Sequence, residues 1–351
     1  MKSILFLLLP VLFISCNTKV NKQEEYKPSF KSIEGDTLLE SKINIRALII
    51  DGDKAWYAGS NGKYGWVSLS GGKNFSGVIV KDSLVPEFRA IAQTSSDIFI
   101  LNAGSPALLY KISKDGKIAR LVYTENGEKV FYDSMQFYND KQGMAMGDPT
   151  DGCISVITTN DGGETWKKIP CEGLPATSEG EAAFAASNTN LVIKEGYTWI
   201  VTGGKKSRVL FSPDKGKTWE AHNTPIVQGS EMTGIFSADF YDRNNGFAVG
   251  GNYEKQAQNT GNKIITEDGG KTWQLEGQAV GFGYASCVQY VPGSNANELF
   301  TAGPSGIYYS YDKGKNWKKV YEDTTLHTLR FADTKTIIAA GQGKIIRLKL
   351  K

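Results

Sequence analysis

The sequence has little of what metal-dependent enzymes and nucleic-acid-binding proteins depend on. It contains two histidines, His222 and His327, and four cysteines without a CxxC spacing, so no histidine–cysteine zinc site stands out. No glycine-rich turn lies between a strand and a helix, as a dinucleotide site requires. Lys and Arg total 40 against 37 Asp and Glu, a formal charge of +3. We therefore predict no metal, no cofactor and no nucleic-acid partner.

Long apolar runs are absent after residue 14. The run from Ile4 to Ile14 is too short to span a bilayer and has the length of a signal-peptide core. It ends at Ser15-Cys16, which resembles a bacterial lipobox, and this resemblance implies a lipidated Cys16. We predict a lipoprotein signal over residues 1–16 and a flexible polar tether over 17–28. The alternative is a plain secretory signal with an incidental cysteine.

Glycine and aromatic residues are plentiful, and they recur in a repeated eight-residue pattern, S/T-x-D-x-G-x-T/N-W. An Asp that accepts backbone hydrogen bonds fixes a tight turn, Gly takes a conformation that other residues resist, and Trp buries a large apolar surface. We therefore predict hairpin turns rather than ligand loops. The four full copies place these residues at Asp161 and Trp166, Asp214 and Trp219, Asp268 and Trp273, and Asp312 and Trp317.

Short apolar strands surround each copy, which predicts a unit of four strands with the repeated turn between the third and the fourth. Residues 29–351 are predicted to form one all-β domain with units of roughly 45 residues, the repeat length of a β-propeller. Seven four-stranded blades fit this length. The segment Ser29–Glu34 would add an outer strand to the last unit and close the ring.

The repeated turns and the unit length resemble the BNR/Asp-box β-propellers, and within them the Ycf48/HCF136-like group, which is named for photosystem II assembly factors. The resemblance covers about residues 38–350. It implies the fold strongly and the function weakly, because Asp-boxes occur in sialidases, in receptors and in scaffolds without enzymatic activity.

Two of the remaining cysteines, Cys153 and Cys171, lie nine residues on either side of a turn predicted near Gly162. Export permits a disulfide between them. The alternative is two free thiols that do not meet, because only the geometry decides whether a bridge can form.

Arginine is scarce, with seven residues, and three of these stand at the starts of predicted inner strands: Arg46, Arg89 and Arg330. Their units are adjacent in a closed ring, so the three guanidinium groups are predicted to converge on an anion or carboxylate site. Ycf48-like propellers carry an arginine patch that this arrangement partly resembles. The alternative is three separate arginines that pair with nearby acids.

Acidic residues are predicted on the same face, and they leave two functions open. The leading hypothesis is a non-catalytic, monomeric module, lipid-anchored in the cell envelope, that binds an anionic protein or glycan through the arginine cluster. The membrane would be touched through the anchor only. The alternative is a glycan-active hydrolase, since glycosidases use a pair of carboxylates. Asp148, Glu181 and Glu231 could supply such a pair.

Overall fold

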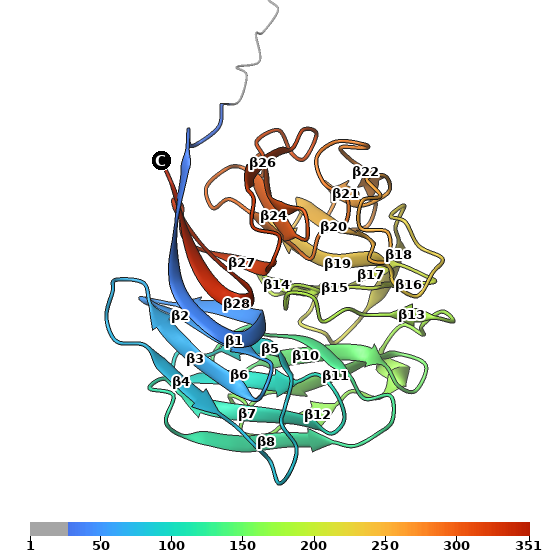
Figure 1. Cartoon of the computed structure of the whole chain (residues 1–351). Helices are drawn as coiled ribbons and strands as arrows, with labels where there is room; N and C mark the ends of the chain where they lie inside the picture. Colours follow the sequence, from blue (N-terminus) through green and yellow to red (C-terminus); the bar gives the residue numbers. More distant parts are fainter. Residues whose placement is uncertain (1–26) are drawn as a thin grey trace, which may run out of the picture.

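The computed structural model describes residues 27–351, so the predicted signal, Cys16 and nearly all of the tether lie outside the described residues. Strands account for almost all of the regular structure in residues 27–351, where the one helix is the short 3-10 helix η1 (Cys171–Gly173). Figure 1 shows the sheets following one another around the molecule until the last strand meets the first. Within the described part of the chain, no helix is long and apolar enough to cross a membrane.

Four of the sheets contain four antiparallel strands each, consecutive in the chain in three of them and interrupted only by β16 in the fourth. They are β5 (Phe88–Gln93), β6 (Asp97–Asn102), β7 (Ala107–Ser113) and β8 (Ala119–Glu125); β9 (Tyr132–Phe137), β10 (Gly143–Pro149), β11 (Ile154–Thr159) and β12 (Lys167–Lys168); β14 (Leu191–Lys194), β15 (Tyr197–Val201), β17 (Arg208–Ser212) and β18 (Glu220–Asn223); and β23 (Cys287–Tyr290), β24 (Leu299–Gly303), β25 (Gly306–Ser310) and β26 (Lys318–Tyr321).

Two further sheets contain six strands each. One consists of β13 (Glu181–Ala182), β16 (Gly203–Gly204), β19 (Thr233–Phe240), β20 (Gly246–Asn252), β21 (Lys263–Thr266) and β22 (Gln274–Leu275). The other, in sheet order, consists of β27 (Leu326–Asp333), β28 (Thr336–Leu350), β1 (Ile33–Asp51), β2 (Lys54–Gly59), β3 (Lys63–Ser68) and β4 (Phe75–Val78).

The prediction of an all-β propeller with four-stranded units is confirmed, but the prediction of seven separate blades is wrong. Across residues 27–351 the strands form six hydrogen-bonded sheets. The reason is that β1 runs without interruption from its pairing with β28 (Ile33 opposite Leu350) into its pairing with β2 (Asp51 opposite Lys54). One strand therefore fuses the first and last repeat units into a single sheet.

This fusion also closes the ring, but the closing segment lies further along the chain than the predicted segment 29–34. Pairing with β28 extends from Ile33 to Asn44 instead of lying within residues 29–34. β28 folds back on itself, because the Leu350 amide donates to the Lys335 carbonyl at 2.8 Å across 15 residues. An extended strand of that length would separate these two residues by roughly 50 Å.

The repeated turns have the hydrogen bonds that their residues predict. In the first copy, Asp161 accepts from the Thr165 amide at 3.0 Å and from the Thr159 hydroxyl at 2.8 Å. The Gly163 amide donates to the Thr159 hydroxyl at 3.0 Å. The other three copies repeat these contacts around Asp214, Asp268 and Asp312. Each turn is thus fixed within eight residues.

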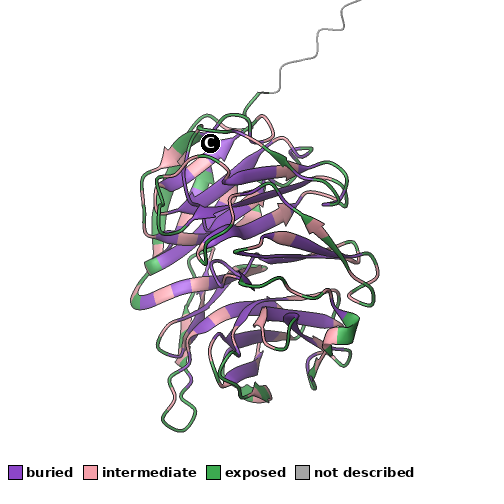
Figure 2. Cartoon of the chain, turned by 90° about the vertical axis from the view of Figure 1, so that its right-hand side faces the viewer, coloured by how far each residue is buried: buried purple, intermediate pink, exposed green. Residues whose placement is uncertain are grey.

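The glycine in each repeated turn lies directly against the second strand of the preceding repeat unit. A Cβ added to Gly163 would stand 2.2 Å from the Phe99 ring, and one added to Gly314 would stand 2.3 Å from the Phe247 ring. Gly216 meets Met144 in the same way, and Gly270 meets Trp199 less tightly. The turns therefore join neighbouring units as well as neighbouring strands. Figure 2 shows the buried residues concentrated in the strands, with exposed residues in the connecting loops.

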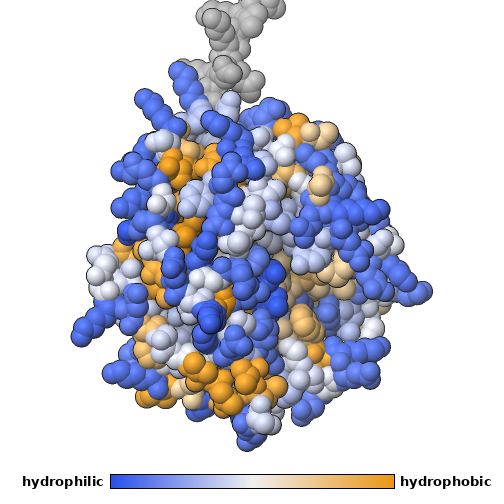
Figure 3. Space-filling model, in the orientation of Figure 1, coloured by the Kyte–Doolittle hydropathy of each residue, from blue (hydrophilic) through white to orange (hydrophobic). Residues whose placement is uncertain are grey.

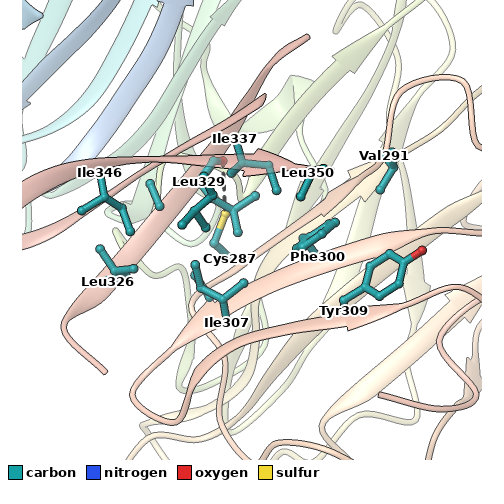
Figure 4. Packing of buried hydrophobic residues seen from close by; sticks show 13 residues of the cluster. Cys287, Val291, Phe300, Ile307, Tyr309, Leu326, Leu329, Ile337, Ile346 and Leu350 are labelled. Carbon is teal, nitrogen blue, oxygen red and sulfur yellow. Dashed lines mark hydrogen bonds between the residues drawn. The ribbon is translucent and has the colours of Figure 1, made fainter. Parts of the chain in front are cut away.

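Apolar side chains also pack between neighbouring units elsewhere in the ring. Figure 4 shows Cys287 and Phe300 packed against Leu329, Ile337 and Ile346, which bring β23 and β24 together with β27 and β28. Cys287 is buried and not bonded to another cysteine, whereas Cys153 and Cys171 form a disulfide with Cα atoms 5.5 Å apart. The face in Figure 3 is mainly hydrophilic, with separate apolar patches.

The centre of the ring is filled by residues 183–190, here called the central segment. The Asn188 side chain donates to the Ile91 carbonyl at 2.8 Å and accepts from the Met135 amide at 3.1 Å. Ser187 donates to the Ser286 carbonyl at 2.5 Å, and Thr189 donates to the Ser237 hydroxyl at 2.7 Å. The central segment therefore ties together strands on several sides of the ring.

The glycine contact predicts a graded loss of stability. Gly163 (φ +77°) and Gly152 (φ +91°) both have left-handed backbones, but only Gly163 faces a neighbouring side chain within 4 Å in that direction. We expect Gly152→Ala to lower the free energy of unfolding by about 1 kcal/mol through backbone strain alone. We expect Gly163→Ala to lower it by roughly 1–3 kcal/mol more, because the methyl group displaces Phe99. Urea denaturation measures both; equal losses would contradict the proposed packing between units.

Candidate functional site

A cavity of about 430 Å³ opens where the inner strands of the ring begin. Arg46 and Arg89 line one part of its wall, Asp148 and Glu231 another, and four small residues of 182–186 complete it around Phe184. Met232 and five aromatic rings form the rest of the lining: Phe131, Phe184, Phe236, Tyr253 and Tyr284. The cavity therefore carries charged groups of both signs together with apolar side chains.

Register breaks in the inner strands determine which side chains stand at the mouth. In five inner strands, one residue at the same level has no partner in the pairing with the second strand of the unit. Such a break is typical of a β-bulge, and a bulge changes the direction of the skipped residue's side chain. We call these the bulge residues: Arg46, Arg89, Asp133, Phe236 and His327. Three of the five line the cavity.

The two arginines of the cavity hold the central segment and keep donors to spare. Arg46 donates from Nη1 to the Ala186 carbonyl at 3.0 Å, and its buried Nε has no acceptor among the described residues. Arg89 donates to the Ala185 carbonyl at 3.3 Å and pairs with Glu87 at 3.1 Å. Burial, followed by repulsion from Arg89, lowers the pKa of Arg46. A guanidinium group has five N–H donors, so an anion in the cavity would find unused ones.

Arg330 does not belong to this pair, and the predicted convergence of three arginines is corrected. It is not part of the cavity lining, and its guanidinium donates to the Ser187 carbonyl at 2.9 Å and to the Leu329 carbonyl at 2.7 Å. The residue that matches Arg46 and Arg89 in register is His327, three positions earlier. The prediction placed Arg330 at the start of its strand, whereas β27 begins at Leu326.

His327 is neutral at physiological pH. Burial, together with the positive charges of Arg46 and Arg89, lowers its pKa to about 3. The mouth of the cavity therefore carries two permanent positive charges beside an uncharged imidazole. Only the observed register reveals this residue, because nothing in the sequence marks it as equivalent to the arginines.

The predicted acidic residues fall into two groups. Asp148 and Glu231 line the cavity, but Glu181 does not. The Glu181 side chain is completely buried and accepts from Arg208 Nε at 3.0 Å, from Arg208 Nη2 at 2.7 Å and from the Thr202 hydroxyl at 2.7 Å. Its hydrogen bonds thus hold β13 against β17, so its place in a catalytic pair is corrected to a structural one.

The sequence prediction missed Asp133, a second carboxyl group near Asp148. Asp133 is fully buried, and neither of its oxygens has a hydrogen-bond donor among residues 27–351. Burial, and then the charge of Asp148, raises its pKa well above the usual range. Asp148 accepts the Ala183 amide at 2.7 Å, and burial raises its pKa to about 6. No group of three or more His, Cys, Asp or Glu side chains in the described part of the chain could hold a metal ion.

The aromatic wall is a packed cluster. Phe184 of the central segment stacks on Phe236 with centroids 3.9 Å apart, and Tyr284 meets Phe236 edge-on at 4.7 Å. Tyr253 completes the wall, and its side chain comes from the loop that follows β20. The cavity thus offers both charge and apolar surface to a ligand.

Comparisons with solved structures show the same fold in proteins with different activities. Ycf48 bound to D1 peptide matches with a TM-score of 0.64 at 15% identity, over 92% of this chain and 96% of that one. The WD40 repeats of RRP9 match with a TM-score of 0.63 at 11% identity, over 90% and 97%. A GH74 xyloglucanase from Xanthomonas campestris matches with a TM-score of 0.61 at 12% identity, over 89% and 53%.

No protein-family model matches the chain, and no curated protein matches it either. Identities of 11–15% to solved structures establish the propeller fold alone. The function must therefore be argued from the cavity.

The raised pKa of Asp148 predicts an unusual pH dependence. The folded chain holds this proton more tightly than the unfolded chain, so Asp148 lowers stability progressively as pH rises from about 4 to above 6. The amide that replaces this carboxyl in Asp148→Asn does not titrate. We expect the free energy of unfolding of Asp148→Asn, relative to the parent, to rise by up to about 3 kcal/mol between pH 4 and pH 7.

Asp140 supplies the control, because hydrogen bonds from Ser95 lower its pKa. As pH rises through the acidic range in which Asp140 titrates, the free energy of unfolding of Asp140→Asn should therefore fall relative to that of the parent. Urea denaturation, followed from the acidic range in which Asp140 titrates up to pH 7, measures both variants. A difference between Asp148→Asn and the parent that does not vary with pH would contradict the burial of this carboxyl.

Proposed function

We propose that the protein is a non-catalytic binding module of the cell envelope that holds a segment of a protein partner in the cavity beside Arg46 and Arg89. The observation that carries this proposal is the buried Nε of Arg46, which has no acceptor among the described residues although it lies at a cavity wall. A buried donor without an acceptor costs stability, and a bound carboxylate would remove that cost.

A protein segment suits the cavity better than a free anion. The volume of the cavity, about 430 Å³, exceeds what one carboxylate needs, and aromatic rings form much of the cavity wall. Such rings bury apolar side chains, and a few placed polar groups then set the orientation of the ligand. The similarity of the fold to Ycf48, solved with a bound peptide, supports the same kind of ligand.

Location in the envelope is part of the proposal and depends on the predicted signal at residues 1–16. The outer half of β1 begins at Ile33 and closes the ring, and just before it Phe30 stacks on Phe300 of β24. A lipid on Cys16 would then hold the propeller at a membrane by a short tether, with its cavity available to a partner in the same compartment.

A photo-crosslinking experiment tests this function. A crosslinker at exposed Glu231, on the cavity lining, should capture a defined partner from native envelope, and one at exposed Lys271, in a repeated turn, should not. We expect Arg46→Gln/Arg89→Gln to reduce the captured partner at least tenfold. The matched control is Arg120→Gln/Arg243→Gln, which removes the same charge away from the cavity and should leave capture unchanged.

Thermal unfolding must accompany this comparison, because both cavity arginines also bind the central segment. If the double variant unfolds early, Ala182→Trp fills the cavity without removing a charge and should block capture equally. Undiminished capture by a folded Arg46→Gln/Arg89→Gln protein, or by Ala182→Trp, would refute the proposed site.

A glycan hydrolase is the second candidate, and the pair Asp148 and Glu231 is the observation that favours it. A carboxyl with a pKa of about 6 is suited to a general acid, and Glu231 could serve as its partner. We expect no release from chromogenic glycosides by the parent protein. Turnover that Asp148→Asn or Glu231→Gln abolishes, while both variants stay folded, would favour the hydrolase.

A further inference from the structure

The acidic side of the cavity has more acceptors than the protein satisfies. Asp148 receives one hydrogen bond, from the Ala183 amide, and Asp133 receives none from any described residue. Buried carboxyl oxygens normally have donors, because an unsatisfied one costs free energy. These two side chains therefore leave acceptors that a ligand could satisfy.

Register places Asp133 at the level of the cavity although it lies beneath the surface. It is the bulge residue of β9, as Arg46 is of β1 and Arg89 of β5, and both arginines line the cavity. The charges of Asp148 and Arg89 both act on Asp133, so the three side chains lie within Coulombic reach of one another. Asp148 thus meets the ligand, and Asp133 stands behind it.

The protein does not neutralise this pair with a cation of its own. The positive charge that acts on Asp133 is that of Arg89, which already pairs with Glu87 and binds the Ala185 carbonyl. Arg46 is held by the Ala186 carbonyl, and His327 is uncharged. The remaining charged group of the lining, Glu231, is also acidic.

The aromatic wall completes a site for a cation. Phe184 and Phe236 stack, Tyr284 stands edge-on to Phe236, and Phe184 and Asp148 both line the same cavity. Ring faces beside a carboxylate attract ammonium and guanidinium groups, and the attraction is stronger where water is excluded.

We infer that Asp148, supported by Asp133, is a subsite for a cationic group of the partner segment, an ammonium or guanidinium group that lies near the acidic group held by Arg46 and Arg89. This inference rests on the proposed function, since both groups belong to one bound segment. It specifies the partner: a segment with a basic and an acidic group close together and an apolar side chain between them or beside them.

Small matched probes test the two subsites separately. Benzylammonium and benzylguanidinium carry the cation, benzyl alcohol is the uncharged control, and benzoate reports on the arginines. Binding of each to the purified domain is measured by protein-observed NMR titration at pH 7.5. We expect the two cations to bind at least tenfold more tightly than benzyl alcohol, and comparison of the two distinguishes a lysine-like from an arginine-like ligand.

The variants then assign the subsite. Asp148→Asn should weaken both cations at least tenfold, Asp133→Asn should weaken them several-fold, and neither should weaken benzoate. Arg46→Gln/Arg89→Gln should weaken benzoate and leave the cations unchanged or tighter. In the parent, the cations should bind more weakly as pH falls from 7.5 to 5, because the pKa of Asp148 is about 6 and His327 does not titrate in that window.

The outcomes separate this inference from the proposed function. Cations that bind no better than benzyl alcohol, or equally well to a folded Asp148→Asn protein, would overturn the cationic subsite while leaving the arginine site standing. Benzoate that fails to bind, with the cations behaving as expected, would overturn the arginine site instead.

Discussion

The central segment is the constraint on which the arrangement of the ring and the site both depend. Its buried polar side chains bond to inner strands on different sides of the ring, as Asn188 does to Ile91 and Met135. Its carbonyls at Ala185 and Ala186 receive the two cavity arginines. A propeller with an open channel would leave these groups facing water. Here they are fixed, and the first four residues of the same segment, 183–186, also line the cavity.

The bulges explain why one ring of similar strands can carry such different side chains at its mouth. A regular strand would point the residue at this level into the packing between neighbouring units, where a charge would be costly. In five inner strands one skipped residue has its side chain re-aimed, so Arg46, Asp133 and His327 occupy equivalent places, although of these three only Arg46 lines the cavity. Charge can therefore vary around the mouth without disturbing the apolar contacts that hold the units together.

The sequence could predict structure that depends on contacts between residues close together in the chain. The repeated turns were predictable because Asp161, Gly163 and Trp166 act within one eight-residue segment, and the structure has those turns. The equivalence of His327 to the two arginines could not be predicted, because it depends on a register break that no local sequence pattern reveals. The pairing of Glu181 with Arg208 is likewise a contact across 27 residues, which appears only once β13 and β17 are in place. Of the residues singled out from the sequence, Arg46, Arg89, Asp148 and Glu231 thus meet at one cavity, whereas Arg330 and Glu181 lie outside its lining.

Asp239 contrasts with the pair Asp133 and Asp148 in the way its oxygens are satisfied. Burial raises the pKa of Asp239 to about 6, as it does for Asp148, yet both oxygens of Asp239 accept backbone amides, from Tyr290 at 2.7 Å and Phe240 at 3.0 Å. That carboxyl fixes β19 against β23 and needs nothing further. Asp133 is more completely buried than Asp239 and accepts no hydrogen bond from residues 27–351. An unsatisfied buried carboxyl costs stability, and the proposed cationic group at the neighbouring Asp148 would offset part of that cost.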